Sequence, residues 1–296
     1  MKAPLLAVAA LLLAGTAQGQ MTAASLAAAA APGSSAGLAA SQPRAVVTGA
    51  TSGLGQALAV QLGAQGWKVA VIGRRQEMLQ NTARMVELAG GTALALTGDV
   101  TDAETVRSNY AAIKEQWGGV DLAILNAGVP SPMDARKFSA AEVHRVMNTN
   151  VGGAANWMEA VLPGMLEQKS GKIAGIASLA GYRGLPIAGP YSASKAALAN
   201  LLEASRIDLK GTGVDVITVN PGFIRTEITK GQDNLPFMLD AEDAANRILK
   251  GIARGDRVIS FPGQLAWPMR LLVKNMPNAI YDWIGRMMAE QRRKNK

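Results

Sequence analysis

A tyrosine and a lysine four residues apart, Tyr191 and Lys195, are types that together can transfer a proton. Side chains four residues apart on a helix lie on one face, so the phenol and the ammonium group would be neighbours. An unperturbed phenol has a pKa of about 10, and a nearby ammonium group stabilises the phenolate and lowers that pKa. The pair therefore predicts a general acid or base, although the same spacing also occurs in helices that carry no chemistry.

A glycine-rich turn at residues 48–55 is a second candidate site. It has the spacing G-x3-G-x-G, follows an apolar segment and opens into a helical one. Glycines let backbone approach a phosphate, and a helix start offers free N–H groups and the positive end of its dipole. No lysine stands where a triphosphate-binding loop needs one, so the turn predicts a dinucleotide site. Its candidate contacts are Gly49, Thr51, Ser52, Gly53, Leu54 and Gly55.

Two arginines, Arg74 and Arg75, follow the next apolar segment. A dinucleotide fold selective for NAD carries an acid there to hold the ribose 2′-hydroxyl, whereas an arginine pairs with the 2′-phosphate of NADP. We therefore expect NADP(H) as the cofactor, with NAD less favoured. The alternative is that both arginines are solvated at the start of a helix.

The elements that must position these residues alternate regularly. Short apolar runs predict strands, and longer stretches with helical periodicity separate them. The expected strands are 45–47, 69–72, 92–97, 122–125, 172–177 and 214–219, and the expected helices are 55–65, 75–89, 101–117, 139–168 and 193–210. This alternation predicts an α/β fold, a single doubly wound Rossmann-type domain with a parallel sheet. Ligands bind such sheets at the carboxyl ends of the strands.

Several ordered motifs over roughly residues 44–228 resemble those of the short-chain dehydrogenase/reductase family. They are the glycine-rich turn, Asp99, Asn126-Ala127-Gly128, Asn150, Ser178, Tyr191-x3-Lys195, and Pro221-Gly222 followed by Thr226. The resemblance implies an NADP(H)-dependent oxidoreductase that interconverts a carbonyl and an alcohol by hydride transfer. It also implies a homodimer or homotetramer.

The resemblance further implies a role for each matching residue. Tyr191 would exchange the proton with the substrate oxygen, and Ser178 would hydrogen-bond that oxygen. Lys195 would hold the nicotinamide ribose and tune Tyr191, while Asn150 would hold a water that links Lys195 to solvent. Asp99 would meet the adenine, and the other cofactor contacts would be Val100, Asn126, Ala127, Gly128, Pro221, Gly222, Ile224 and Thr226. Many NADP-binding members carry a basic residue in place of Ser52, so here the 2′-phosphate would rest on Arg74, with Arg75 beside it.

Two variable segments, 180–190 and 227–240, are expected to recognise the substrate. Their apolar residues favour a hydrophobic carbonyl compound, unless those residues serve packing alone. A function from another class is an NADP(H)-binding sensor or scaffold without turnover, because a fold does not by itself guarantee chemistry. The intact set of Ser178, Tyr191 and Lys195 favours the enzyme.

The composition excludes several other classes. The chain of 296 residues has no cysteine and a single histidine, His144, which excludes disulfides and clustered-histidine metal sites, so we expect no metal. The formal charge of +8 is concentrated at the end: residues 263–296 contain seven basic and two acidic residues. A charge confined to the tail argues against nucleic-acid binding.

The two ends of the chain differ from its middle. Residues 1–20 fit a signal peptide or a hydrophobic anchor, unless translation starts at Met21, and 21–42 form a low-complexity linker. Residues 43–262 would be the catalytic domain. An exported enzyme would lack a recycled NADP pool, so we expect a cytoplasmic active site, with tethering at a membrane as an option. Export is the alternative if residues 1–19 are a cleaved signal peptide.

The final segment, 263–296, has apolar residues at helical spacing, tryptophans and a basic end, with expected breaks at Pro268 and Pro277. This pattern fits an amphipathic element that contacts an anionic membrane surface or covers a lipid-like substrate. The alternatives are a helical cap on the core and an oligomer contact.

Overall fold

The computed structural model describes residues 42–229 and 235–294. In this part of the chain seven strands form one parallel sheet. They are β1 (Arg44–Thr48), β2 (Lys68–Gly73), β3 (Thr92–Thr97), β4 (Leu122–Leu125), β5 (Gly171–Ile176), β6 (Val214–Pro221) and β7 (Val258–Phe261). Their order is β3-β2-β1-β4-β5-β6-β7, so the winding reverses between β1 and β4. The predicted α/β fold is confirmed.

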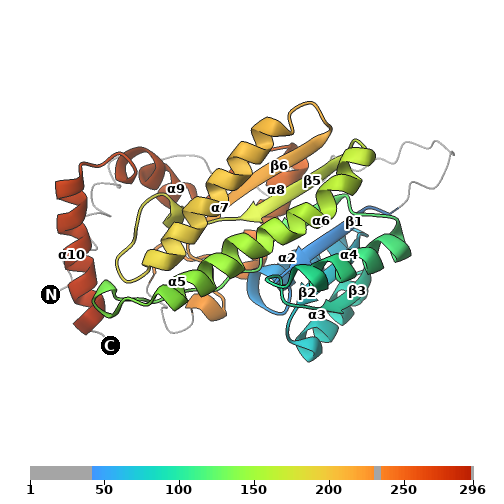
Figure 1. Ribbon diagram of the computed structural model, residues 1–296, viewed down its shortest axis with the longest axis horizontal. Coiled ribbons are helices and arrows are strands. Elements are labelled where there is room, and N and C mark those ends of the chain that lie inside the picture. The colour runs from blue at the N-terminus through green and yellow to red at the C-terminus, as the bar shows by residue number, and fades with distance from the viewer. Residues whose placement is uncertain (1–41, 230–234, 295–296) are drawn as a thin grey trace, which may run out of the picture. The chain divides into compact units, whose positions relative to one another are not determined.

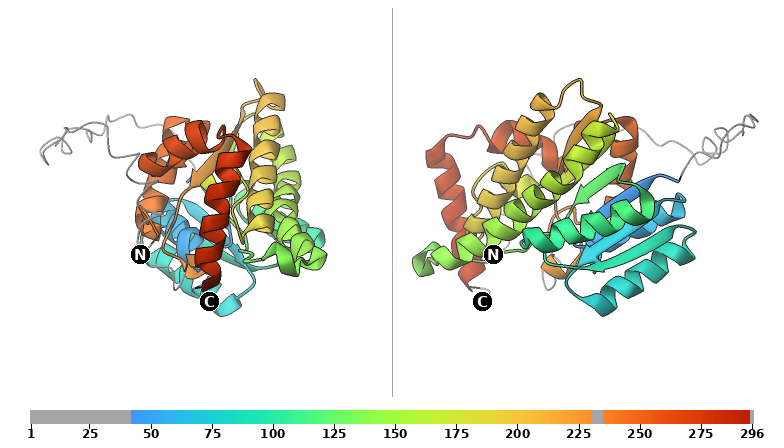
Figure 2. Two further views of the ribbon diagram at one scale, coloured as in Figure 1. Left: turned by 90° about the vertical axis from the view of Figure 1, so that its left-hand side faces the viewer. Right: turned by 45° about the vertical axis from the view of Figure 1, so that its right-hand side comes forward.

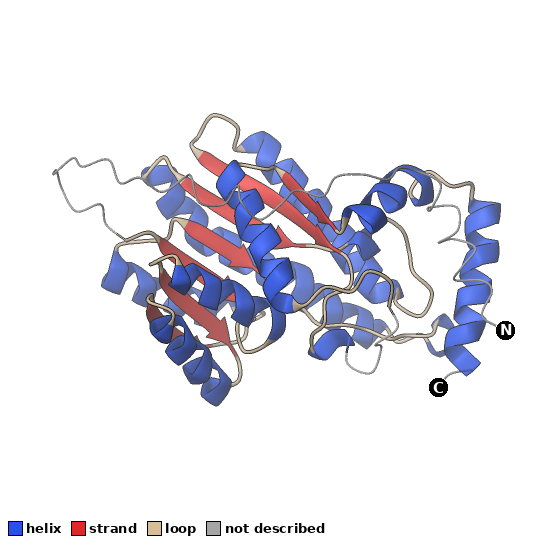
Figure 3. Ribbon diagram, turned by 180° about the vertical axis from the view of Figure 1, so that it is seen from behind, coloured by secondary structure: helices blue, strands red, loops and turns tan. Residues whose placement is uncertain are grey.

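Helices cover both faces of the sheet (Figures 1 and 3). One apolar core lies under α2 (Gly53–Ala64), α3 (Gln76–Leu88) and α8 (Ala241–Arg254). The other lies under α4 (Ala103–Trp117), α6 (Gly153–Glu167) and α7 (Gly189–Asp208). The inner strands are buried on both faces, which explains why they are apolar along their whole length.

The six predicted strands are present, with ends shifted by a few residues at most. β7 and α8 were not predicted. β7 has only four residues, too few to establish a periodicity, but α8 carries a helical signal: Ala241, Ala244, Ala245, Ile248 and Leu249 are all buried.

The predicted helical stretch 139–168 is continuous but contains an irregular turn. Ser139 caps its start by accepting a hydrogen bond from the backbone N–H of Glu142 at 3.2 Å. α5 (Ala140–Met147) then passes through a π-helical turn, Asn148–Gly152, into α6. Such π turns recur at functional sites, and this one contains Asn150.

The C-terminal segment forms α9 (Gly263–Pro268), a π-helical turn (Met269–Val273) and α10 (Asn278–Lys294). The expected break at Pro277 is confirmed, and α9 ends at Pro268 as expected, but the chain stays helical through the π turn that follows. Pro268 has no N–H with which to close an α-helical turn, and the wider π turn that follows accommodates it. α10 runs across the side of the sheet where the strands end (Figure 2).

The hydrophobic segment 1–20 and almost all of the linker 21–42 lie outside the described residues. Within the described ranges, no helix is both long and apolar enough to cross a lipid bilayer.

Candidate active site

The glycine-rich turn packs too tightly for other residue types. Gly49 has φ +65°, and a Cβ there would lie 2.9 Å from the Cα of Ala127. Gly53 has φ +56°, and a Cβ there would lie 3.0 Å from Cγ2 of Thr226. Two glycines therefore let the turn touch the segments that follow β4 and β6, at the reversal of the sheet.

The start of α2 fits an anionic ligand. Its N-cap residue, Ser52, is extended and makes no side-chain capping bond, and the first turn contains no acidic residue. The N–H groups and the positive dipole end of the helix are thus left for a phosphate. Leu54 and Gly55 are buried behind the turn and form its floor.

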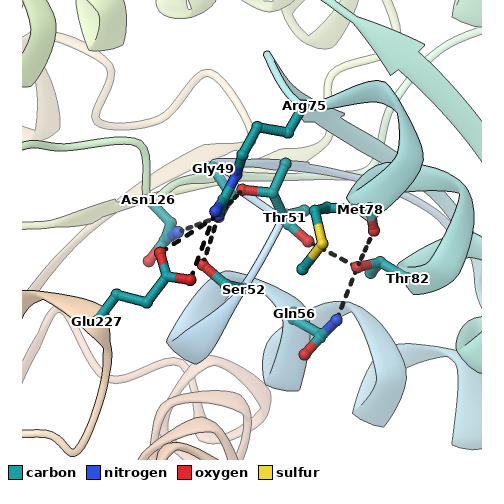
Figure 4. Close-up of polar contacts among 10 residues, drawn as sticks. Gly49, Thr51, Ser52, Gln56, Arg75, Met78, Thr82, Asn126 and Glu227 are labelled. Atoms are coloured by element: carbon teal, nitrogen blue, oxygen red, sulfur yellow. Dashed lines mark hydrogen bonds and ion pairs between the residues drawn. The ribbon is translucent and has the colours of Figure 1, made fainter. Parts of the chain in front are cut away.

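Arg75 lies over the turn (Figure 4). Its Nη2 donates to Oγ1 of Thr51 at 2.8 Å and to Oγ of Ser52 at 2.9 Å, and its guanidinium pairs with Glu227 at 3.4 Å. Arg74 instead is more exposed and lies 3.6 Å from the carboxylate of Asp99. The geometry thus makes Arg75 the arginine on the turn, whereas the sequence put the emphasis on Arg74.

Side-chain hydrogen bonds hold Asp99 and Val100, which lie just after β3. Oδ1 of Asp99 accepts hydrogen bonds of 2.9 Å from both the N–H and the hydroxyl of Thr101. Burial alone would raise the pKa of Asp99, but the bonds from Thr101 and the nearby Arg74 lower it, so the carboxylate stays charged. The Val100 side chain is buried, and its carbonyl accepts from Nδ2 of Asn156 at 2.9 Å.

Asn126 and Thr48 fasten the end of β4 to the turn. Nδ2 of Asn126 donates to the carbonyls of Thr48 at 3.0 Å and Gly49 at 3.2 Å. Oγ1 of Thr48 accepts from the N–H groups of Asn126 and Ala127, both at 3.0 Å. Thr48 was not among the predicted site residues, although its place at the end of β1, directly before Gly49, is a signal for such a role.

Ser178, Tyr191 and Lys195 come together at the carboxyl end of β5. Tyr191 lies in the first turn of α7, and Lys195 lies one turn later, with Nζ 5.7 Å from the centre of the Tyr191 ring. Lys195 is buried, and its Nζ donates to the carbonyl of Ile176 at 2.6 Å. Ser178 donates to the carbonyl of Pro221 at 3.5 Å and caps the short turn after it.

Burial controls the proton affinity of this group. It raises the pKa of the Tyr191 phenol, and the neighbouring Ser178 hydroxyl lowers it by less. The sequence predicted a net lowering of this pKa by Lys195, but in the free protein the cost of burying the phenolate sets the net direction. The same cause lowers the pKa of Lys195 to about 8.

Asn150 joins the active-site loop to α7. Its Oδ1 accepts from the N–H of Val129 at 2.7 Å, and its Nδ2 donates to the carbonyl of Val129 at 3.1 Å and to Oγ of Ser194 at 2.9 Å. A Cβ on Gly128 would lie 3.2 Å from Oδ1 of Asn150 and 3.4 Å from Nζ of Lys195, so these three residues are neighbours. Ser194, which was not predicted, is fully buried at this junction.

The predicted residues after β6 follow one another along the edge of the site. The N–H of Gly222 donates to the carbonyl of Phe261 at 2.7 Å, and Ile224 forms an isolated bridge with Leu239. Thr226 then lies against Gly53. Among the described residues, no group of acids and histidines could hold a metal ion.

A family model described as short chain dehydrogenase matches residues 43–234 of the chain. The chain belongs to the short-chain dehydrogenase family. As a short-chain dehydrogenase it is an enzyme that acts on CH–OH or carbonyl groups with NAD or NADP.

Proteins similar in sequence to this short-chain dehydrogenase are named as oxidoreductases or reductases. An uncharacterized oxidoreductase of Myxococcus xanthus (strain DK1622) is 42% identical over 245 residues, 82% of this chain and 96% of the relative. The ketoacyl reductase HetN of Nostoc sp. (strain PCC 7120 / SAG 25.82 / UTEX 2576) is 36% identical over 179 residues, 60% of this chain and 62% of that protein.

Solved structures of reductases resemble this short-chain dehydrogenase as well. A variant of actinorhodin polyketide ketoreductase crystallised with NADPH has a TM-score of 0.71 at 29% identity, covering 76% of this chain and 97% of that one. Levodione reductase has a TM-score of 0.72 at 25% identity, covering 77% and 98%.

Proposed function

We propose that this enzyme is an NADP(H)-dependent reductase of apolar carbonyl compounds, in which Tyr191 is the proton donor. The observation that carries the proposal is the meeting of Ser178, Tyr191 and Lys195 at the edge of the sheet where the glycine-rich turn also lies. An acid and a dinucleotide site on one edge are what the reduction of a carbonyl requires.

Arg75 supports the preference for NADP(H). Its Nη2 donates to the hydroxyls of Thr51 and Ser52, which places the guanidinium over the turn, where it could pair with a 2′-phosphate. Arg74 stands next to it on β2's end and adds a second positive charge. The uncapped start of α2 would hold the pyrophosphate, and Asp99, Asn126 and the segment from Pro221 to Thr226 would line the rest of the cofactor.

Tyr191 is placed to act as the acid in the reduction. When bound, the cofactor supplies the hydride to the carbonyl carbon. The pKa of the Tyr191 phenol lies above neutrality, so its hydroxyl carries a proton at pH 7 and can donate it to the carbonyl oxygen as negative charge develops there. Ser178 would hydrogen-bond the same oxygen and orient it toward Tyr191.

Lys195 and Asn150 would support the acid. Lys195 in its ammonium form would bind ribose hydroxyls and stabilise the phenolate that remains after proton transfer. Asn150 fixes the loop at Val129 and reaches Ser194, whose hydroxyl donates to the carbonyl of Tyr191 at 2.8 Å. It would thereby position the start of α7, and a water held by Asn150 would link Lys195 to solvent.

The substrate side supports an apolar compound. An open groove of about 500 Å³ lies between the loop before α7 and α10. Its lining combines apolar side chains with charged ones: Leu185, Pro186, Tyr281 and Ala289 with Asp282, Arg286, Glu290 and Arg293. The names of the relatives, which include ketoacyl and polyketide ketoreductases, support a ketone within a carbon chain.

The remaining expectations stay predictions. They are the division at residues 43–262 and 263–296, a homodimer or homotetramer, a cytoplasmic active site, and peripheral membrane contact through the C-terminal segment. The exposed Trp267, Leu272 and Trp283 beside basic residues support a contact surface on that segment.

The decisive test combines binding and turnover. Fluorescence titration of NADPH and NADH on the wild type and Arg75→Ala is expected to show tighter NADPH binding that the substitution removes. NADPH consumption over a panel of ketones and aldehydes is expected to fall at least about 100-fold in Tyr191→Phe, the size of a lost general acid, while NADPH binding persists. Binding without turnover on any carbonyl would contradict the proposed reaction.

A further inference from the structure

Glu227 reaches the cofactor edge from a distant part of the chain (Figure 4). Its Oε1 and Oε2 each lie 3.4 Å from a different guanidinium nitrogen of Arg75, and the two residues are 152 positions apart. The contact therefore has the two-pronged form in which arginine also binds phosphate. It ties the segment after β6 to the glycine-rich turn.

The backbone holds Glu227 in this place. Glu227 opens a short 3-10 turn, Glu227–Thr229, directly after Thr226, which packs on Gly53. Oγ1 of Thr229 accepts from the N–H of Thr226 at 3.1 Å and donates to the carbonyl of Ile224 at 2.7 Å. Glu227 is the first residue of this hydrogen-bonded turn, and the turn therefore holds its carboxylate beside Arg75.

Both arginines at the end of β2 have an acidic partner, and the partners differ. Arg74 faces Asp99, which Thr101 fixes through two bonds of 2.9 Å. Arg75 faces Glu227, whose side chain is 61% exposed. Two positive and two negative charges balance, so a bound 2′-phosphate would add about 1.5 to 2 uncompensated negative charges.

We propose that Glu227 weakens the preference of this enzyme for NADP(H) by occupying Arg75 in the free protein, so that NADP(H) must displace its carboxylate while NAD(H) need not. The inference rests on the proposed 2′-phosphate site at Arg75. Glu227 can leave Arg75, because its side chain is exposed and a free carboxylate is well solvated. Asp99, the partner of Arg74, is instead fixed by Thr101. Glu227 thus weakens the binding of NADP(H) and leaves the binding of NAD(H) unchanged.

The exposure of the Arg75–Glu227 ion pair to solvent limits how much Glu227 can weaken NADP(H) binding. A solvent-exposed ion pair contributes at most about 1 kcal/mol, which corresponds to about a fivefold change in a dissociation constant. The effect also has a salt signature, because at 1 M ionic strength the screening length falls to about 3 Å. The difference between the wild type and a variant without the carboxylate should therefore shrink at high salt.

The test compares Glu227→Gln with the wild type in fluorescence titrations of NADPH and NADH. We expect the dissociation constant for NADPH to fall about three- to fivefold and that for NADH to stay unchanged. The matched control is Glu203→Gln, which removes the same charge from an exposed ion pair with Arg206. Glu203 is 63% exposed, close to Glu227, and should change neither constant.

Arg75→Ala separates the two claims. If Arg75→Ala leaves NADPH binding unchanged, the 2′-phosphate site itself is wrong. If it weakens NADPH binding but Glu227→Gln tightens neither cofactor, tightens both equally or weakens NADPH, only the role of Glu227 is overturned. In the Arg75→Ala background Glu227→Gln should have no effect on NADPH, because the competition has been removed.

Discussion

The cofactor edge and the C-terminal segment of this protein are held in place by different forces. Around β1, β2 and α2 the inward-facing apolar side chains are fully buried, as for Leu58, Leu62 and Val71. In α9 and α10 large apolar side chains remain outside: Trp267 is 64% exposed and Trp283 63%. Apolar burial stabilises the first region, so its geometry is rigid, and the second must be attached in another way.

Polar contacts attach the C-terminal segment. Arg183, on the loop before α7, donates to the carbonyls of Val273 at 3.1 Å and Met276 at 2.6 Å and to Oδ1 of Asn278 at 2.6 Å. It also stacks on the Tyr281 ring at 4.2 Å, and the Tyr281 hydroxyl donates to the carbonyl of Gly184 at 2.7 Å. One arginine thus joins the start of α10 to the loop that lines the proposed substrate groove. Little of the apolar surface of α9 and α10 is buried within the chain, and a cap on the core stays one of the expected roles of this segment.

Among the variants considered, Leu62→Ala should lose the most unfolding free energy. Leu62 is 1% exposed in the core under α2, and removing a buried leucine side chain there costs about 2 to 5 kcal/mol of unfolding free energy. Trp283→Ala should stay within about 0.5 kcal/mol, because that side chain is mostly solvated. Urea unfolding of both variants measures the difference. A loss in Trp283→Ala equal to that in Leu62→Ala would show that the C-terminal helix is part of the core.

The pH dependence of stability should reveal the buried Lys195. Its pKa in the folded protein is about 8, below the ordinary value of 10.5, so between these values the unfolded chain binds the extra proton. Stability should therefore rise as the pH increases from 8 to 10, by at most about 1.4 kcal/mol per unit. Above pH 10 the raised pKa of Tyr191 acts in the opposite direction.

Urea unfolding of the wild type and Lys195→Met at several pH values measures the contribution of Lys195 to this pH dependence. A rise of equal size in both proteins would assign it to another group. Reduction itself should weaken above about pH 8, because the ammonium form of Lys195 is then lost. The kcat/KM for reduction, measured over the same range, follows that loss.

Arg183→Ala should leave the global stability nearly unchanged and act only on the C-terminal side. Losing hydrogen bonds from a charged donor costs about 1 to 3 kcal/mol locally, so α10 should detach more often while the sheet keeps its stability. Limited proteolysis should cut residues 274–294 faster in the variant, with the unfolding midpoint almost unchanged. Arg270→Ala is the control, an exposed arginine in the same segment. Equal cleavage in both variants would contradict the role of Arg183.

Local patterns explain why much of the fold was predictable. The strands are apolar because both faces are covered, and the start of α5 follows from Ser139 as an N-cap. α7 begins four residues earlier than predicted, at Gly189, because Pro190 is well suited to the first turn of a helix. The π turns around Asn150 and after Pro268 were beyond prediction, since they depend on neighbouring segments.

The sequence by itself determined the order of the first six strands and of the helices between them, the glycine-rich turn and the spacing of Tyr191 and Lys195. Periodicity, turn chemistry and helical spacing are local properties of the chain. The tertiary structure alone decided that Arg75 covers the turn, that Glu227 pairs with it and that Arg183 holds the C-terminal segment. It also decided the direction of the Tyr191 pKa. Each of these depends on burial or on contacts between residues far apart in the sequence, and spacing carries no information about either.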